Sequence, residues 1–71
     1  MLFYPGTTVQ PKVGDFIKIE NETLEVEEVI ISSKQRELWG VSENGIMIIG
    51  GSYGRLFDNL DHTSQVEYIK K

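Results

Sequence analysis

The chain has 71 residues, enough for a single domain (1–71) with a thin core, because a chain of this size buries only about 60% of the surface that its unfolded form exposes. It contains no cysteine, which excludes disulfides and thiolate metal sites. Seven basic and eleven acidic side chains give a net charge of −4. Nucleic-acid binding depends on cations that neutralise phosphates, so direct binding to DNA or RNA is disfavoured.

The first residues, MLFYPGTTVQPK, lack the basic and long apolar segments of a secretory signal. The longest apolar run, residues 46–49, is too short to cross a bilayer. We therefore expect a cytoplasmic protein that makes no membrane contact of its own.

Two strands are predicted in the first half of the chain, at 15–20 and 23–31. In the first strand, Ile17 and Ile19 alternate with polar residues, which is typical of a strand with one buried face. The glutamates of the second segment would also suit a helix, but its valines and isoleucines favour a strand.

The second strand changes parity along its length. Leu24 and Val26 occupy even positions, whereas Val29 and Ile31 occupy odd ones. Because side chains of a strand alternate between two faces, both pairs reach the core only if the chain slips by one residue between them. The sequence therefore predicts a β-bulge at positions 27–28, with the extra bend that a small barrel needs.

Two further strands are predicted at 36–42 and 45–50, joined by Asn44-Gly45, since Asn-Gly between apolar segments is a strong hairpin signal. Residues 46–49 are apolar on both faces, and an exposed apolar strand favours pairing with a second copy. We therefore expect a homodimer. A loop of about fifteen residues and a last strand at 65–70 complete the prediction. Long loops in compact domains tend to be functional, so this loop is a candidate for a binding role.

These elements predict an all-β fold, a small bent antiparallel five-stranded barrel with one long loop before the last strand. The layout resembles the SH3-like barrel families, including Tudor and KOW-type domains, through V-G-D-x-I-x-I at 13–19, V-x-x-V at 26–29, W-G-V at 39–41 and V-E-Y-I at 66–69. The resemblance implies this fold and a habit of binding partners. The acidic composition, and the lack of glycines between the first two strands, depart from KOW domains and their association with RNA.

Aromatic residues near the predicted loop could form a cage for cations or belong to the core, and a partly exposed patch for protein contact lies between these two interpretations. In Tudor-like barrels, aromatic side chains at strand ends form cages for methylated cations, and the resemblance would place such a cage at Trp39, Tyr53 and Phe57. A small barrel also needs its large apolar side chains inside, which favours core positions for Trp39 and Phe57.

The glycine-rich segment GGSYGR, residues 50–55, is the most distinctive stretch of the chain. It lacks the Gly-Lys-Ser/Thr ending of a phosphate-binding loop. We predict a binding loop in which Tyr53 and Arg55 contact a partner, with Phe57 or Trp39 beside them, because tyrosine and arginine are enriched among binding hot spots. The alternative is a spacer loop with Arg55 in a surface ion pair.

Residues 58–62 place two carboxylates, an amide and the only histidine close together. Such a group could meet a divalent ion, but hydrogen bonds from side chains to nearby backbone groups explain this composition better. We expect no metal and no cofactor. No cysteine or serine is paired with a histidine in a way that suggests nucleophilic catalysis, so we expect no catalytic residues and no enzyme activity.

The predicted function is a non-enzymatic protein-binding module, such as an adaptor, a regulatory subunit or a small bacterial or phage inhibitor, that binds through the glycine-rich loop 50–57. One alternative is a protein that sequesters a small ligand or nucleotide with Tyr53 and Arg55. Another is an acidic mimic of nucleic acid, in which the five glutamates between positions 20 and 28 imitate phosphates.

Overall fold

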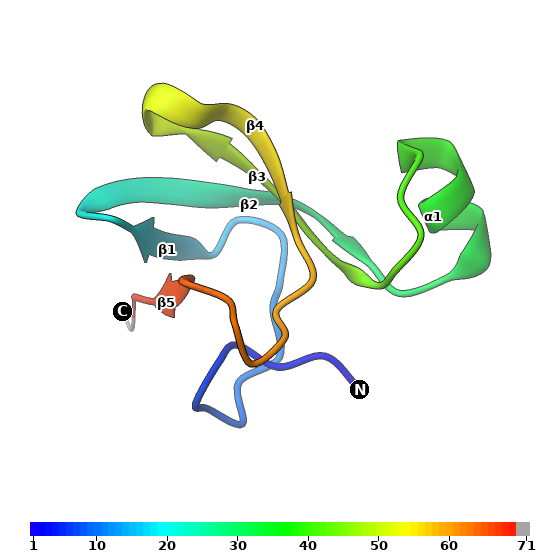
Figure 1. Cartoon of the computed structure of the whole chain (residues 1–71), viewed down its shortest axis with the longest axis horizontal. Helices are drawn as coiled ribbons and strands as arrows, with labels where there is room; N and C mark the ends of the chain where they lie inside the picture. The colour runs from blue at the N-terminus through cyan, green and yellow to red at the C-terminus, as the bar shows by residue number, and fades with distance from the viewer. Residues whose placement is uncertain (70–71) are drawn as a thin grey trace.

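The computed structural model describes residues 1–69, which form one five-stranded antiparallel sheet with a single α-helix (Figure 1). The strands are β1 (Phe16–Ile19), β2 (Glu22–Ile30), β3 (Gly45–Gly50), β4 (Gly54–Asp58) and β5 (Glu67–Tyr68). The helix α1 spans Ser33–Trp39, and a short 3-10 turn, η1, spans Gly51–Tyr53. The all-β fold with five antiparallel strands is confirmed.

The strand order is β4-β3-β2-β1-β5, so β4 and β5 are the two edges of the sheet. The two edge strands do not pair with each other within residues 1–69, and the sheet is therefore open where a closed barrel was predicted. In Figure 1 both edges lie in front of the central strands, β4 above and β5 below. The segment 59–66, rather than a loop of fifteen residues, leads from β4 to β5.

The predicted bulge in β2 is confirmed. Val26 pairs with Ile48 and Glu28 pairs with Met47, so Glu27 is the extra residue between two consecutive pairs of β3. The slip brings Val29 against the core. Ile31, in contrast, is 62% exposed, because β2 ends at Ile30 and the chain turns away towards α1.

The strand predicted at 36–42 is wrong, since the chain forms α1 there. Ser32 and Gln35 make a reciprocal capping box, which satisfies backbone N–H groups at the start of the helix. Gly40 ends the helix with a φ of 70°, a left-handed conformation that glycine adopts without strain. Lysine, glutamine, arginine, glutamate and leucine fill positions 34–38 between these caps, and all of them favour helix.

The hairpin predicted at Asn44-Gly45 is also wrong. Asn44 ends the connection from α1, and Gly45 is the first residue of β3. The hairpin lies one strand later, between β3 and β4, with η1 at its tip. Gly45 has a packing role instead. A Cβ atom at this position would lie 2.8 Å from the ring of Phe57 and would also meet the carbonyl oxygen of Asp58.

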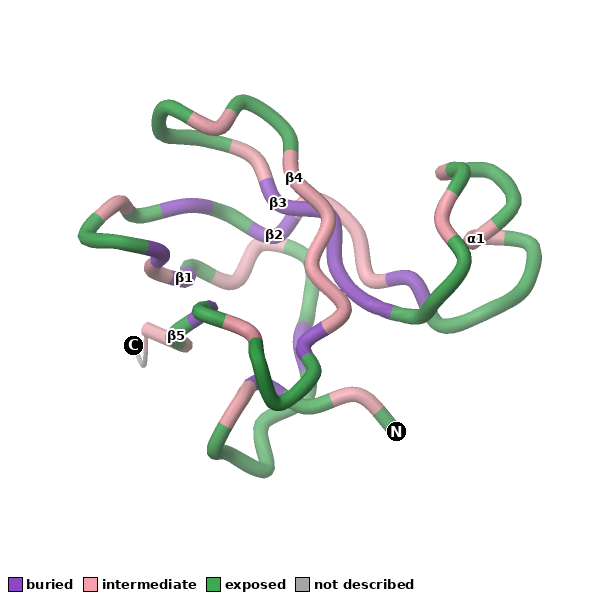
Figure 2. Tube along the Cα trace, viewed as in Figure 1, coloured by how far each residue is buried: buried purple, intermediate pink, exposed green. Residues whose placement is uncertain are grey.

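The core lies on the inner face of the bent sheet (Figure 2) and extends to the N-terminal segment. Tyr4, in that segment, is only 1% exposed, stacks on Tyr68 with ring centroids 4.8 Å apart, and donates a hydrogen bond to Asp15 Oδ2 at 2.8 Å. The core cluster consists of Tyr4, Ile17, Ile19, Leu24, Val26, Ile46, Ile48, Leu60 and Val66.

The strand expected to be exposed, β3, is covered. It lies between β2 and β4, and Ile46, Met47 and Ile48 are all buried. The observation that suggested a homodimer is therefore absent from the structure, and self-association stays a prediction. Between residues 1 and 69, neither α1 nor the short η1 is long and apolar enough to cross a membrane.

Candidate functional site

The segment GGSYGR forms the tip of the β3–β4 hairpin, and three of its side chains contact glutamates of the β1–β2 hairpin. Ser52 donates from its N–H and its hydroxyl to Glu22, both at 2.8 Å. Tyr53 donates its phenol to Glu20 Oε2 at 3.0 Å. These contacts hold the tip against the neighbouring hairpin, which gives part of the glutamate cluster a structural role.

Arg55 makes the third contact. Its Nη2 donates to Glu27 Oε2 at 2.8 Å, and its Nε lies 2.8 Å from Glu27 Oε1, outside the angular range of a hydrogen bond, so this second contact is purely an ion pair. The guanidinium also lies 5.6 Å from the ring centre of Trp39, a cation–π contact. Arg55 is 58% exposed, and an ion pair of this kind contributes at most about 1 kcal/mol. The interpretation with Arg55 in a surface ion pair matches this geometry.

Trp39 and Phe57 do not belong to the core cluster, so the expectation of core positions is wrong for both. Each is half-buried. Phe57 pairs with Met47 across the β3–β4 ladder, and Arg55 pairs with Ile49. Because residues two apart on a strand share a face, Arg55 and Phe57 both lie on the face of β4 opposite Leu56, which packs on the core. The aromatic residues Trp39, Tyr53 and Phe57 are thus distributed over both faces and do not form one cage. Trp39 lies against Arg55 instead.

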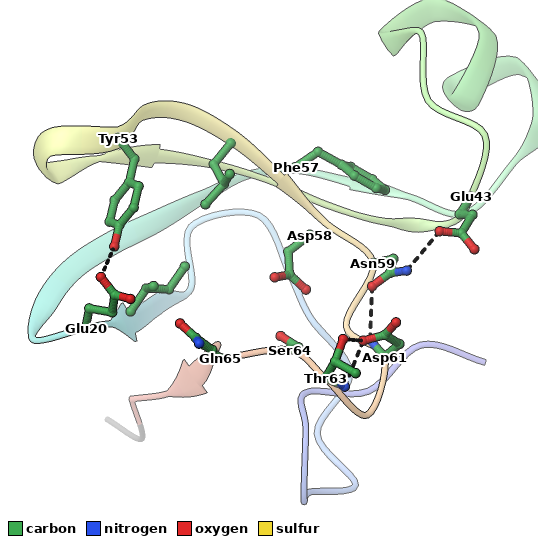
Figure 3. A pocket seen from close by; sticks show the side chains of 12 residues that line it. Glu20, Glu43, Tyr53, Phe57, Asp58, Asn59, Asp61, Thr63, Ser64 and Gln65 are labelled. Atoms are coloured by element: carbon green, nitrogen blue, oxygen red, sulfur yellow. Dashed lines mark hydrogen bonds between the residues drawn. The ribbon is translucent and has the colours of Figure 1, made fainter.

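An open groove of about 540 Å³ lies between β4 and the segment 59–65 (Figure 3). Its apolar lining comes from β1, η1 and β4, namely from Ile19, Tyr53, Leu56 and Phe57. Gln65, which precedes β5, also lines it. The groove therefore occupies the gap between the two edges of the sheet, where a closed barrel would have strand pairing.

Four carboxylates surround this groove, those of Glu20, Glu43, Asp58 and Asp61 (Figure 3). Each accepts hydrogen bonds from neutral donors: Glu20 from Tyr53 (3.0 Å), Glu43 from Asn59 (2.8 Å), Asp58 from the N–H of Leu60 (2.7 Å) and Asp61 from Thr63 (2.6 and 2.9 Å). No lysine or arginine of residues 1–69 lines the groove. The ionisable groups that line the groove are therefore all acidic.

The surroundings of Asp61 and Tyr53 also determine their protonation states. The hydroxyl and N–H of Thr63 hold the pKa of Asp61 below its usual value. Partial loss of hydration, together with the carboxylates of Glu20 and Glu22, raises the pKa of Tyr53. At neutral pH Asp61 is therefore ionised, and Tyr53 is a neutral phenol that can donate to Glu20.

The segment 58–62 is a turn stabilised by its own side chains, as its composition suggested. Asp58, Asn59 and Asp61 each accept a hydrogen bond from a backbone N–H two residues later. Within the described chain, no three residues among histidine, cysteine, aspartate and glutamate are placed to hold a metal ion.

Sequence reasoning missed Glu20, Asp58 and Asp61 as parts of one site, because they come from different elements that only the bent sheet brings together. The signal available in the sequence was the acidic character of both segments. No family model, curated protein or solved structure matches this chain. The resemblance to SH3-like barrels therefore stays a prediction, and the site has to be interpreted from its own geometry.

Proposed function

We propose that this protein is a non-enzymatic protein-binding module that holds a segment of its partner in the groove between β4 and residues 59–65. One observation carries the proposal: a groove that combines polar residues with a few hydrophobic ones lies at the gap between the two edge strands, beside Tyr53. Its volume falls within the range of ligand sites, and its open side suits a chain segment rather than an enclosed small molecule.

The glycine-rich hairpin has two predicted contact residues, Tyr53 and Arg55, and we propose that only one of them contacts the partner. Tyr53 lines the groove, so we propose that it contacts the bound segment of the partner. Arg55 does not line the groove and is engaged by Glu27 and Trp39, so we assign it to holding the hairpin in place. A nucleotide site built from Tyr53 and Arg55 together has less support, because the two side chains do not converge.

Selection of peptides from a random display library against the intact chain tests the proposal. We expect the selected peptides to shift the backbone amide NMR signals of Tyr53, Leu56, Asp58 and Gln65, which line the groove. Tyr53→Ala should weaken these peptides about tenfold or more, as loss of a binding hot spot does, whereas Tyr53→Phe keeps the ring and most of the affinity.

Arg55→Ala is the matched control, since it truncates a large side chain two residues away that does not line the groove. It should leave peptide affinity within about twofold, because Arg55 makes no contact in the groove and its exposed ion pair with Glu27 contributes little. If Arg55→Ala weakens binding as much as Tyr53→Ala, or if the shifted amides lie elsewhere, the groove is not the binding site.

A further inference from the structure

We infer that the partner segment is an extended, basic stretch of polypeptide that adds to the free edge of β4; this inference rests on the proposed function and specifies its ligand. β4 is an edge strand that pairs only with β3 in the described chain. Every second residue of such a strand directs its N–H and C=O away from the sheet. Pairing with these groups is how a sheet edge binds an extended peptide.

The edge of β4 is accessible for such pairing. No backbone hydrogen bond joins residues 54–58 to any described segment other than β3. The strand, GRLFD, contains neither proline nor lysine, two residues that commonly protect edges. Its five residues extend about 17 Å, which matches a ligand segment of similar length.

The charges that line the groove determine which kind of peptide segment fits there. Figure 3 shows Glu20 beside Tyr53 at one end of the groove and Glu43 with Asp61 at the other. Ile19 and Leu56 add aliphatic residues to its lining. The ligand that complements this arrangement carries lysine or arginine towards both ends and an aliphatic residue between them. Such charge complementarity selects a partner and speeds its association.

Four capped probes of about seven residues, long enough to cover β4, test the inference with the intact chain. The first alternates lysine and valine, and the second has glutamate in place of lysine. The third and fourth are lysine–valine peptides N-methylated at every odd or every even amide. Spermidine serves as a cation without a peptide backbone.

We expect the lysine–valine peptide to shift the groove amides and to bind about tenfold or more tightly than the glutamate version. Only one edge of an added strand pairs with β4, so one methylated peptide should lose binding while the other keeps it. The double variant Asp58→Asn/Asp61→Asn should weaken the lysine–valine peptide. The control Glu25→Gln/Glu37→Gln removes the same net charge outside the groove and should not.

The contrary outcomes are distinguishable. Equal binding of both methylated peptides would overturn strand addition, and equal binding of the glutamate version would overturn the basic ligand. Binding of spermidine without binding of the lysine–valine peptide would make this a site for small cations. In each of these cases, library peptides that still map to the groove would leave the proposed function standing. If no peptide from either set shifts the groove amides, the proposed function itself fails.

Discussion

Tyr4 shows how much of this small fold depends on single side chains. It stacks on Tyr68 of β5 and donates to Asp15, which precedes β1, so one residue joins three parts of the chain. Asp15 also accepts from the N–H of Lys12 at 2.9 Å, which fixes the chain entering β1. No periodic pattern indicates this role, because Tyr4 lies in an irregular segment outside every predicted strand.

Substitution of Tyr4 by phenylalanine tests the phenol separately from the ring. Burial of the phenol raises the pKa of Tyr4 above its ordinary value of 10.0, and the hydrogen bond to Asp15 raises this pKa further. The folded state therefore holds a proton that the unfolded chain releases, so stability is full below pH 10.0 and falls as the pH rises further.

Tyr4→Phe should lose about 1 kcal/mol near neutral pH through the missing hydrogen bond. Its free energy of unfolding should then fall less steeply than that of the parent above about pH 10, the ordinary tyrosine value. Urea unfolding across this range measures both effects. Parallel curves for variant and parent would show that Tyr4 does not titrate with unfolding.

Gly45 gives a second prediction at this scale. Gly45→Ala places a methyl group against the ring of Phe57 and the carbonyl of Asp58, and overpacking of this kind costs about 1–3 kcal/mol. The cost should shrink in a Phe57→Ala background, where the ring is gone. Equal costs in both backgrounds, measured by chemical denaturation, would mean that the ring is not what excludes a side chain here.

Individual elements differ in how well the sequence predicts them. The bulge of β2 was predictable because Leu24 and Val26 differ in parity from Val29, and burial on one face forces the slip. The helix α1 was missed although Ser32 and Gln35 have the spacing of a capping box, because valine and tryptophan at 39–41 favoured a strand. The Asn-Gly signal misplaced the hairpin, since Gly45 serves close packing rather than a turn.

Deletion of Glu27 tests the bulge. Without the extra residue, either Val26 or Val29 must turn away from the core, and the loss should reach about 3 kcal/mol. Glu27→Gln is the control, because it keeps the chain length and removes only the charge that pairs with Arg55, for a loss of about 1 kcal/mol or less. Similar melting temperatures for deletion and control would refute the structural role of the bulge.

At the scale of the whole molecule, the open sheet creates the proposed site. The groove draws on β1, η1, β4 and the segment before β5, so no contiguous stretch of sequence contains it. Sequence patterns could predict the strands and the acidic character, but not the gap between the edges, since that depends on how far the sheet curves. Of the four predicted contact residues, Tyr53 and Phe57 line the groove, whereas Trp39 and Arg55 do not.

The stability of the fold also depends on the N-terminal segment. Removal of residues 1–9 takes away Tyr4, and loss of a large buried aromatic side chain costs about 3–5 kcal/mol. Because a core of this size supplies only about 3–5 kcal/mol in total, the shortened chain should be largely unfolded. A narrow range of amide proton chemical shifts would show that the shortened chain is unfolded. Tyr4→Ala in the full chain should lower the free energy of unfolding by a similar amount. A shortened chain that melts cooperatively like the parent would contradict the prediction.

The stack of Tyr4 on Tyr68 also has a consequence for synthesis. These two residues lie near opposite ends of the sequence, and β5 pairs with β1 only at Ile17 and Lys18. A nascent chain therefore cannot complete its core until residue 68 has emerged from the ribosome. Until then the edge of β1 and the ring of Tyr4 stay without their partners in β5, so the domain should fold only after β5 has been synthesised and not strand by strand.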